Sequence, residues 1–268
     1  MGRKAGVLVG LMGGLSLFLT GCFDVEQSLV LNKDLSGTAG IHMGVNFEPM
    51  VLTMLRMQRQ MAGAEGEPTV AEIAKAKEDF LASKKQDAPP SPEVQRSTIE
   101  KALPPGVKLL DVDIKDEGFK LAVRMSFAFD NVRKLQEIKL PDDLKAQKEK
   151  ADGEAPKPAG KNPFANPFDG LQITDEGSTL LLTTQPNNPV SSTTDMLPPD
   201  TTPEMKKQIE EAFKGLHVVW KIETPFEVLE SNATRREGKT LIWEYDLKTF
   251  EAMTPQQRAE GIRVKLKK

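Results

Sequence analysis

Alternating apolar and polar residues mark the first structured part of the chain. Two runs, Val25 to Leu31 and Ile41 to Phe47, carry apolar side chains at alternate positions, with mostly polar or small residues between them. The segment that joins them, Lys33 to Gly37, has the composition of a tight turn. A period of two residues is typical of a strand with one buried and one solvated face. The pattern therefore predicts an antiparallel hairpin.

From Glu48 to Met61 the period changes to that of a helix. Four methionines at spacings of four, three and four residues share one helical face: Met50, Met54, Met57 and Met61. Unbranched thioether side chains adapt to irregular apolar shapes, so this helix could line a ligand groove or cover an acyl-binding cavity. The alternative is a core face packed on the sheet. The two interpretations overlap, because a helix that lines a cavity is also partly core.

Two further helices have clear start signals. Thr69 and Glu72 have the spacing of a capping box, which predicts a helix that begins at about residue 70. Ser91 and Pro92 stand in the preferred cap and first-turn positions of a third helix, which should stop before Pro104. These helices follow the methionine-rich helix directly, so the middle of the chain is mainly helical up to about residue 103.

A second hairpin is predicted after the third helix. Two runs, Leu110 to Ile114 and Phe119 to Phe129, alternate apolar and polar residues, and Asp116-Glu117-Gly118 forms the turn between them. A short helix should follow Asp130.

The rest of the chain returns to short strands after a segment of different composition. Residues 141–170 are charged and rich in Pro, Lys, Ala and Gly, which predicts a flexible excursion within one domain because strand patterns resume after it. Strands are then expected at 171–173, 180–184, 216–224, 240–245 and 262–266, with a helix at 202–215. The predicted fold class is α+β: a mostly antiparallel twisted sheet with helices packed on one face, which could surround an apolar groove or cavity.

The amino-terminal residues have the plan of a secretory signal. Arg3 and Lys4 precede a stretch without any charged residue, Ala5 to Phe23. Its last part, Leu19-Thr20-Gly21-Cys22, resembles the lipobox of bacterial lipoproteins. The resemblance implies cleavage between Gly21 and Cys22 and acylation of Cys22 with chains such as palmitate. Two or three chains make a stable anchor, since each buried CH₂ contributes about 0.8 kcal/mol. A retained transmembrane anchor and an ordinary cleaved signal are the alternatives.

This processing divides the chain into residues 1–21, a lipoprotein-type signal peptide, and residues 22–268, a single extracytoplasmic α+β domain. Removal of the signal takes away two of the 36 basic residues and none of the 39 acidic ones, leaving a net charge of about −5. That balance does not favour a nucleic-acid partner. Cys22 is the only cysteine, so once it is acylated neither disulfides nor thiol chemistry remain.

Candidate catalytic groups are few. His42 and His217 fall at polar positions of alternating strands, where they could share a wet face and bind a metal, although ordinary surface histidines fit as well. Asp111 and Asp113 have the spacing of two carboxylates on one strand face, suited to acid–base chemistry or simply to solvent. No phosphate-binding loop, Cys/His cluster or nucleophile elbow is present. We therefore expect no enzyme, no cofactor and no metal site.

Two aromatic residues stand out in the excursion. Phe164 and Phe168 each follow Asn-Pro. They could contact a membrane interface or fill a groove, or they could fold back onto the body.

Two segments carry a resemblance to a known family. CFDVEQSLVLNKDLSGTAGI leads from the cysteine into a hairpin with a glycine turn, and ETPFEVLESNATRREGKTLIWEYDL, from Glu223 to Leu247, joins a strand, Ser231-Asn232-Ala233, a glycine turn and a tryptophan strand. This order resembles the LppM-type lipoproteins of the bacterial envelope. The resemblance covers both ends of the body but not its middle. It implies an extracytoplasmic α/β domain with a hydrophobic cavity or groove that handles lipids or glycolipids without catalysis.

The expected function is thus that of a lipid-anchored envelope protein whose ligand is a lipid or glycolipid. The alternative is an assembly or protein-interaction lipoprotein with no small-molecule ligand. Phe23, and not Asp, follows the cysteine. In enterobacterial lipoproteins an Asp at that position retains the protein at the inner membrane, so in a host with an outer membrane this protein should reach the outer membrane and face the periplasm.

Overall fold

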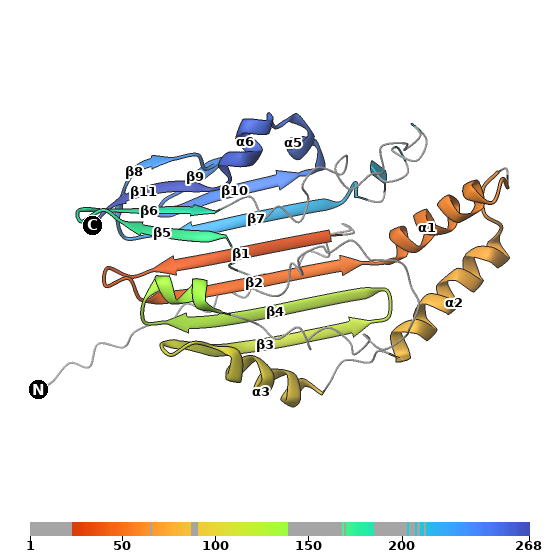
Figure 1. Cartoon of the computed structure of the whole chain (residues 1–268), viewed down its shortest axis with the longest axis horizontal. Coiled ribbons are helices and arrows are strands. Elements are labelled where there is room, and N and C mark those ends of the chain that lie inside the picture. Colours follow the sequence, from red (N-terminus) through yellow and green to blue (C-terminus); the bar gives the residue numbers. More distant parts are fainter. Residues whose placement is uncertain are drawn as a thin grey trace, which may run out of the picture.

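The computed structural model describes residues 23–64, 66–86, 91–138, 168, 170–184, 203, 207, 210–211 and 213–268. They form two β-sheets with helices at the ends and edges (Figure 1). The predicted α+β class is confirmed, and all strand pairs but one are antiparallel. The strands divide between two sheets, which alternation along single strands does not reveal.

The larger sheet has seven strands in the order β3-β4-β2-β1-β7-β10-β9. Their bounds are β1 Phe23–Leu31, β2 Gly37–Asn46, β3 Val107–Glu117, β4 Lys120–Phe129, β7 Leu216–Glu223, β9 Arg235–Glu237 and β10 Thr240–Asp246. Both predicted hairpins, β1–β2 and β3–β4, are present, and β2 joins them by pairing with β4. On its other side, β1 pairs in parallel with β7. The amino-terminal strand therefore lies in the middle of the sheet.

The smaller sheet has the order β5-β6-β11-β8. Its strands are β5 Leu171–Asp175, β6 Thr179–Thr184, β8 Glu227–Ser231 and β11 Arg263–Lys267. Buried leucines of β6 and β11, Leu180, Leu182 and Leu266, belong to the same core cluster as Leu29 of β1 and Trp243 of β10. The smaller sheet thus covers part of one face of the larger one.

Strand register assigns the side chains of the larger sheet to two faces. Apolar partners such as Ile41 and Met125 share one face, which we call the inner face. The opposite face carries polar partners such as His42 and Arg124, and we call it the outer face. The core lies between the inner face and the smaller sheet, together with the 3₁₀ helix η1, Val132–Glu137, whose Leu135 is fully buried.

The side chain of Asn232 connects β10, β11 and the turn at Gly261 through hydrogen bonds. Asn232 Oδ1 accepts hydrogen bonds from the Trp243 indole N–H and the Arg263 backbone N–H, both at 2.8 Å. Its Nδ2 donates to the Gly261 carbonyl at 2.7 Å. Gly261 has φ +57°, and a Cβ there would lie 2.2 Å from the Thr184 carbonyl oxygen, so only glycine fits. Trp243 can be wholly buried because its one donor is satisfied.

The helices begin where the caps predict. α1 spans Glu48–Met61, α2 Val70–Gln86 and α3 Pro92–Ala102. Thr69 and Glu72 form the expected reciprocal bonds before α2, and Ser91 accepts from the Val94 N–H at the start of α3. Two short helices near the carboxy terminus, α5 Leu247–Ala252 and α6 Pro255–Glu260, are additions to the predicted set.

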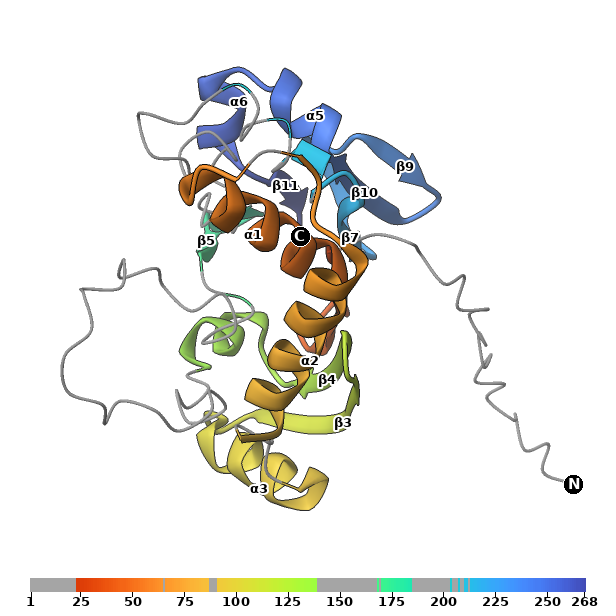
Figure 2. The same cartoon turned by 90° about the vertical axis from the view of Figure 1, so that its right-hand side faces the viewer.

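The position of α1 and α2 differs from the expected packing of helices over a sheet face. The two helices pack against each other as an antiparallel pair and project beyond the ends of the strands (Figure 1). Viewed from that end, they stand in front of the larger sheet (Figure 2). Because α1 follows β2 almost without a loop, it continues away from the sheet instead of folding back over it. We call this pair the α1–α2 arm.

Candidate functional site

The end of the larger sheet where β1 begins carries several of the candidate residues. Phe23 pairs with Val45 of β2 and with Leu216 of β7. Two residues after Val45 the chain reaches Phe47, and α1 starts at Glu48. We call this the Phe23 end of the sheet. Cys22 and Gly21, the predicted acylation and cleavage residues, lie outside the described residues. Cys22 is nonetheless covalently joined to Phe23, so an acyl anchor on it would start at this end.

On β1 and β4, burial along the inner face decreases toward the Phe23 end. On β1, Leu29 and Leu31 are buried, whereas Val25 is half-buried. On β4, Phe127 is fully buried, whereas Leu121 is half-buried. Five half-buried apolar residues of β1, β2 and β4 lie in this region: Phe23, Val25, Val45, Leu121 and Val123. We call them the open half of the inner face, and their register places them together on β1, β2 and β4.

Two of the four methionines of α1 are exposed. The side chains of Met50 and Met54 are 41% and 54% exposed, and Met57 is half-buried. The side chain of Met61 lies outside the described part of the chain. α1 packs beside α2, and the pair projects beyond the ends of the strands. The methionine-lined groove stays a prediction, and the structure adds that Met50 and Met54 are exposed.

An aromatic stack holds the α1–α2 arm to the sheet. The Phe80 ring of α2 lies between Phe47 and Phe119, with centroid distances of 5.5 and 5.4 Å. Lys84 Nζ donates to Asp116 at 2.7 Å and to the Gly118 carbonyl at 2.8 Å, both in the β3–β4 turn. The same ammonium lies 5.2 Å from the centre of the Phe47 ring. The base of the arm is thus fixed to two strand ends.

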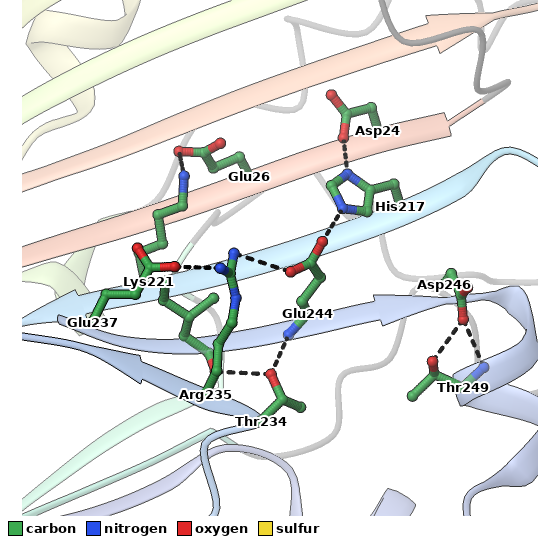
Figure 3. A network of polar contacts seen from close by, with 11 residues as sticks. Asp24, Glu26, His217, Lys221, Thr234, Arg235, Glu237, Glu244, Asp246 and Thr249 are labelled. Carbon is green, nitrogen blue, oxygen red and sulfur yellow. Dashed lines mark hydrogen bonds and ion pairs between the residues drawn. The ribbon is translucent and has the colours of Figure 1, made fainter. Parts of the chain in front are cut away.

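The outer face at the Phe23 end carries a polar network, shown in Figure 3. His217 of β7 contacts Asp24 of β1 through Nδ1 at 3.0 Å and Glu244 of β10 through Nε2 at 3.1 Å. Glu244 also contacts Arg235 of β9 at 3.1 Å. Farther along, Lys221 contacts Glu26 at 2.8 Å. The network joins four adjacent strands across the centre and edge of the sheet.

The two carboxylates favour the charged form of His217. Partial burial acts to lower the pKa of His217, but the hydrogen bonds to Glu244 and Asp24 outweigh it, so this pKa lies above its ordinary value. The same contact with His217, supported by Arg235, lowers the pKa of Glu244. A doubly hydrogen-bonded imidazolium has no lone pair for a metal or for a substrate proton. His217 therefore acts as a clamp between strands.

The other polar candidates lie on the same face without forming a cluster. His42 pairs with Glu26 of β1 and Arg124 of β4, and Asp113 pairs with that arginine from β3. Asp111 is two residues farther along β3, opposite Ser126. The two histidines share a face as expected. In the described residues no group of three His, Cys, Asp or Glu side chains is arranged to hold a metal ion.

Of the two phenylalanines predicted to contact a membrane or a groove, Phe164 and Phe168, only Phe168 is among the described residues. Phe168 is 1% exposed and meets Phe127 edge-on, with ring centroids 6.1 Å apart. It folds back onto the body, the second of the two interpretations of this residue, and its ring is buried rather than exposed to a membrane. The physical reason is that the core between η1 and β4 buries the whole ring. Phe164 lies outside the described residues.

The polar network was missed by the sequence analysis, apart from His217. The available signal was alternation, which puts Asp24 and Glu26 on the polar side of β1. Their partners, His217 and Lys221 of β7, are 193 and 195 residues away, and alternation specifies which face a residue occupies but not which strand lies beside it.

The fold and site together define an α+β protein built on a mixed seven-stranded sheet with a helical arm at one end. Among solved structures, the NMR structure of the folded domain of LppM from Mycobacterium tuberculosis is similar, with a TM-score of 0.42, 12% sequence identity and 94% of each chain covered. Likeness at this level assigns neither a family nor a function. No protein-family model and no curated protein matches the chain. No described helix is long and apolar enough to cross a membrane.

Proposed function

We propose that the protein is a non-catalytic, lipid-anchored lipoprotein of the bacterial cell envelope that binds lipid or glycolipid ligands on the open half of the inner face. The proposal rests on one observation: the open half of the inner face and the predicted acylation residue lie at the same end of the sheet. The open half begins at Phe23, one peptide bond after the cysteine of the lipobox-like Leu19-Thr20-Gly21-Cys22. An anchor at Cys22 would hold these apolar side chains beside the membrane that supplies the ligand.

The chemistry of the polar groups supports a binding role over a catalytic one. Both ring nitrogens of His217 are used by carboxylates, and the lysine and arginines of the network are paired with acidic side chains. These pairs connect strands and leave no nucleophile–base couple. Half-exposed apolar residues on a rigid sheet suit an acyl chain, because burial of each CH₂ is worth about 0.8 kcal/mol.

The anchor is tested with a Cys22→Ser variant of the full chain. Expressed in a bacterium that processes lipoproteins, the wild-type protein should remain in the membrane fraction and show an acylated amino-terminal peptide by mass spectrometry. The variant should lose the acyl groups and move to the soluble fraction. Membrane retention of an unacylated wild-type chain would disprove the lipid anchor and favour an uncleaved signal.

The ligand is tested by native mass spectrometry of protein purified from the envelope. Wild-type protein should carry co-purified lipid, and Leu121→Gln with Val123→Gln should reduce that lipid at least about tenfold, since two apolar contacts are lost. Ala122→Gln is the matched control, because Ala122 lies between them on β4 and points to the outer face. A lipid-free wild-type protein, or equal lipid in all variants, would argue for the protein-interaction alternative.

A further inference from the structure

The side of α1 turned away from α2 carries no charge. All three charged residues of α1 pair with residues of α2 or of the segment leading into it. Arg56 contacts Glu67 at 2.8 Å, Arg59 contacts Glu72, and Glu48 contacts Lys77. The exposed residues of α1 are then Met50, Met54, Gln58 and Gln60. The exposed side therefore has an apolar first half and an uncharged polar second half.

Met50 and Met54 are the large apolar side chains exposed on α1, and they lie in its first two turns. These turns are the part of the arm nearest to the sheet. Val45, the cross-strand partner of Phe23, precedes Met50 by five residues. A chain anchored at residue 22 therefore places its acyl chains and this methionine pair at the same end of the molecule.

The arm is held rigidly enough to keep that arrangement. The Phe47–Phe80–Phe119 stack and the Lys84 contacts fix its base to the β2 and β3–β4 ends, and the three ion pairs tie α1 to α2 along its length. Figure 1 shows the pair projecting from the sheet at the end where β1 begins. Met50 and Met54 are thus exposed on an element that projects from the sheet.

We propose that the exposed side of α1 lies against the lipid bilayer that holds the protein's own acyl anchor, with Met50 and Met54 inserted between the lipid headgroups. This inference rests on the proposed lipid anchor and adds a second contact with the membrane. The occupant is a bilayer because the anchor restricts this end to the membrane surface. The absence of charge on the inserted side avoids the cost of desolvating ions there. Flexible thioether side chains fit the irregular packing of the interface.

The single cysteine makes a direct test practical. Once Cys22 is acylated, its sulfur is a thioether, so an introduced cysteine is the only free thiol in the full chain. Met54→Cys is labelled with a nitrobenzoxadiazole fluorophore, and the purified lipoprotein is reconstituted in phosphatidylethanolamine and phosphatidylglycerol vesicles with nitroxide-bearing acyl chains. Lys33→Cys is the matched control, because Lys33 is exposed in the β1–β2 turn at the opposite end of β1.

The label at position 54 should lose at least about half its emission to the nitroxide lipids, as expected for a group at the depth of an interfacial helix, while the label at position 33 should not change. Replacement of Met50 by Gln in the Met54→Cys chain should weaken the quenching. An acylated protein with no quenching at position 54, or equal quenching at both positions, would overturn the inference. A blue-shifted but unquenched label would indicate an apolar contact other than the bilayer, such as a second copy of this chain, and would also overturn it.

The mass of the amino-terminal peptide separates failure of the arm contact from failure of the anchor. If residue 22 is acylated and position 54 is unquenched, the anchor stands and the arm contact is wrong. If residue 22 is unmodified, its thiol also takes the label, so position 54 is then measured in a chain that also carries Cys22→Ser. Quenching there in vesicle-bound protein means that the anchor is wrong and the arm binds the membrane by itself. If residue 22 is unmodified and position 54 is unquenched, both are wrong.

Discussion

At the scale of single residues, a few polar side chains connect strands that are far apart in the sequence. His217 joins β1, β7 and β10, and Asn232 joins β10, β11 and the Gly261 turn. Neither residue stands in a motif that marks it. Asn232 matters because it accepts from the indole N–H of the wholly buried Trp243, and a buried donor without an acceptor costs about 1–3 kcal/mol.

The charged His217 clamp should make stability depend on pH. A pKa raised in the folded state means that the contribution is fully present below the unfolded pKa and is lost as the pH rises through the folded pKa. His217→Gln should therefore lower the free energy of unfolding by about 1 kcal/mol at about pH 5.5, a modest value because the ring is partly solvated. The difference should shrink toward about pH 9. Urea unfolding at the two pH values measures it.

The control for this prediction removes the carboxylates. In a chain that carries Asp24→Asn and Glu244→Gln, the further change His217→Gln should cost the same at both pH values, because no acidic partner then favours the imidazolium. A pH-dependent loss that persists in that background would show that another group is responsible.

Asn232 should be more important than its exposed position suggests. Asn232→Ala leaves the wholly buried Trp243 N–H without its acceptor and should lower the free energy of unfolding by about 1–3 kcal/mol. Asn232→Asp retains the acceptor for Trp243 and Arg263 and loses only the bond to Gly261, so its loss should be smaller. Denaturant melts followed by tryptophan fluorescence compare the two. Equal losses would mean that the Gly261 bond dominates.

At the scale of elements, local patterns were sufficient for most helices and strands. Alternation predicted β1, β2 and β4, the capping residues predicted where α2 and α3 begin, and the turn at Asp116-Glu117-Gly118 is present. These features depend on neighbouring residues only. The position of α1 could not be predicted in this way, because its methionine period shows a helix with an apolar face and does not show whether a sheet, another helix or neither covers that face.

The two short carboxy-terminal helices show a different limit. Each carries a cap that local reasoning can recognise: Asp246 accepts from the Thr249 N–H before α5, and Thr254 forms a capping box with Gln257 before α6. Each helix has only six residues, too few for a helical period to be distinguished from chance. A search for caps that does not also require a long apolar period would have found both.

The α1–α2 arm should behave as one unit whose attachment depends on Phe80. Phe80→Ala removes the central ring of the aromatic stack and should reduce the local free energy of opening of the arm by about 2 kcal/mol, less than for a fully buried ring. Hydrogen–deuterium exchange should accelerate in α1 and α2 and remain unchanged in β1, β2 and β7. Lys75→Ala, an exposed change on the same helix, serves as the control. Uniformly faster exchange throughout the sheet would contradict an independent arm.

At the scale of the whole molecule, the larger sheet depends on its amino-terminal strand. β1 pairs with β2 on one side and with β7 on the other, so it joins the part of the sheet formed by β2, β4 and β3 to the part formed by β7, β10 and β9. The sequence pattern showed that β1 is a strand and which of its faces is apolar. Its central, parallel position depends on a partner about 190 residues away, and local patterning carries no information on that pairing.

A proline in β1 should therefore prevent folding of the whole domain. Ser28 pairs with Gly40 on one side and Lys221 on the other, and Ser28→Pro should cost at least about 3 kcal/mol because it disrupts ladders within a central strand. Circular dichroism should show loss of the cooperative melt. Arg236→Pro, in the short edge strand β9, should retain it. A normal melt for Ser28→Pro would mean that the two parts of the sheet are stable separately.

Because β1 pairs in parallel with β7, the larger sheet cannot be completed until β7 has been synthesised. During synthesis β1 emerges first, whereas Leu216–Glu223 follow about 190 residues later, which at about 5–20 residues per second is roughly 10–40 seconds. Until then one edge of the central strand remains unpaired and open to pairing with other chains. A nascent chain that stops before residue 216 can fold its hairpins but cannot complete the sheet, so the last fifth of the chain decides whether the first strand is protected from aggregation.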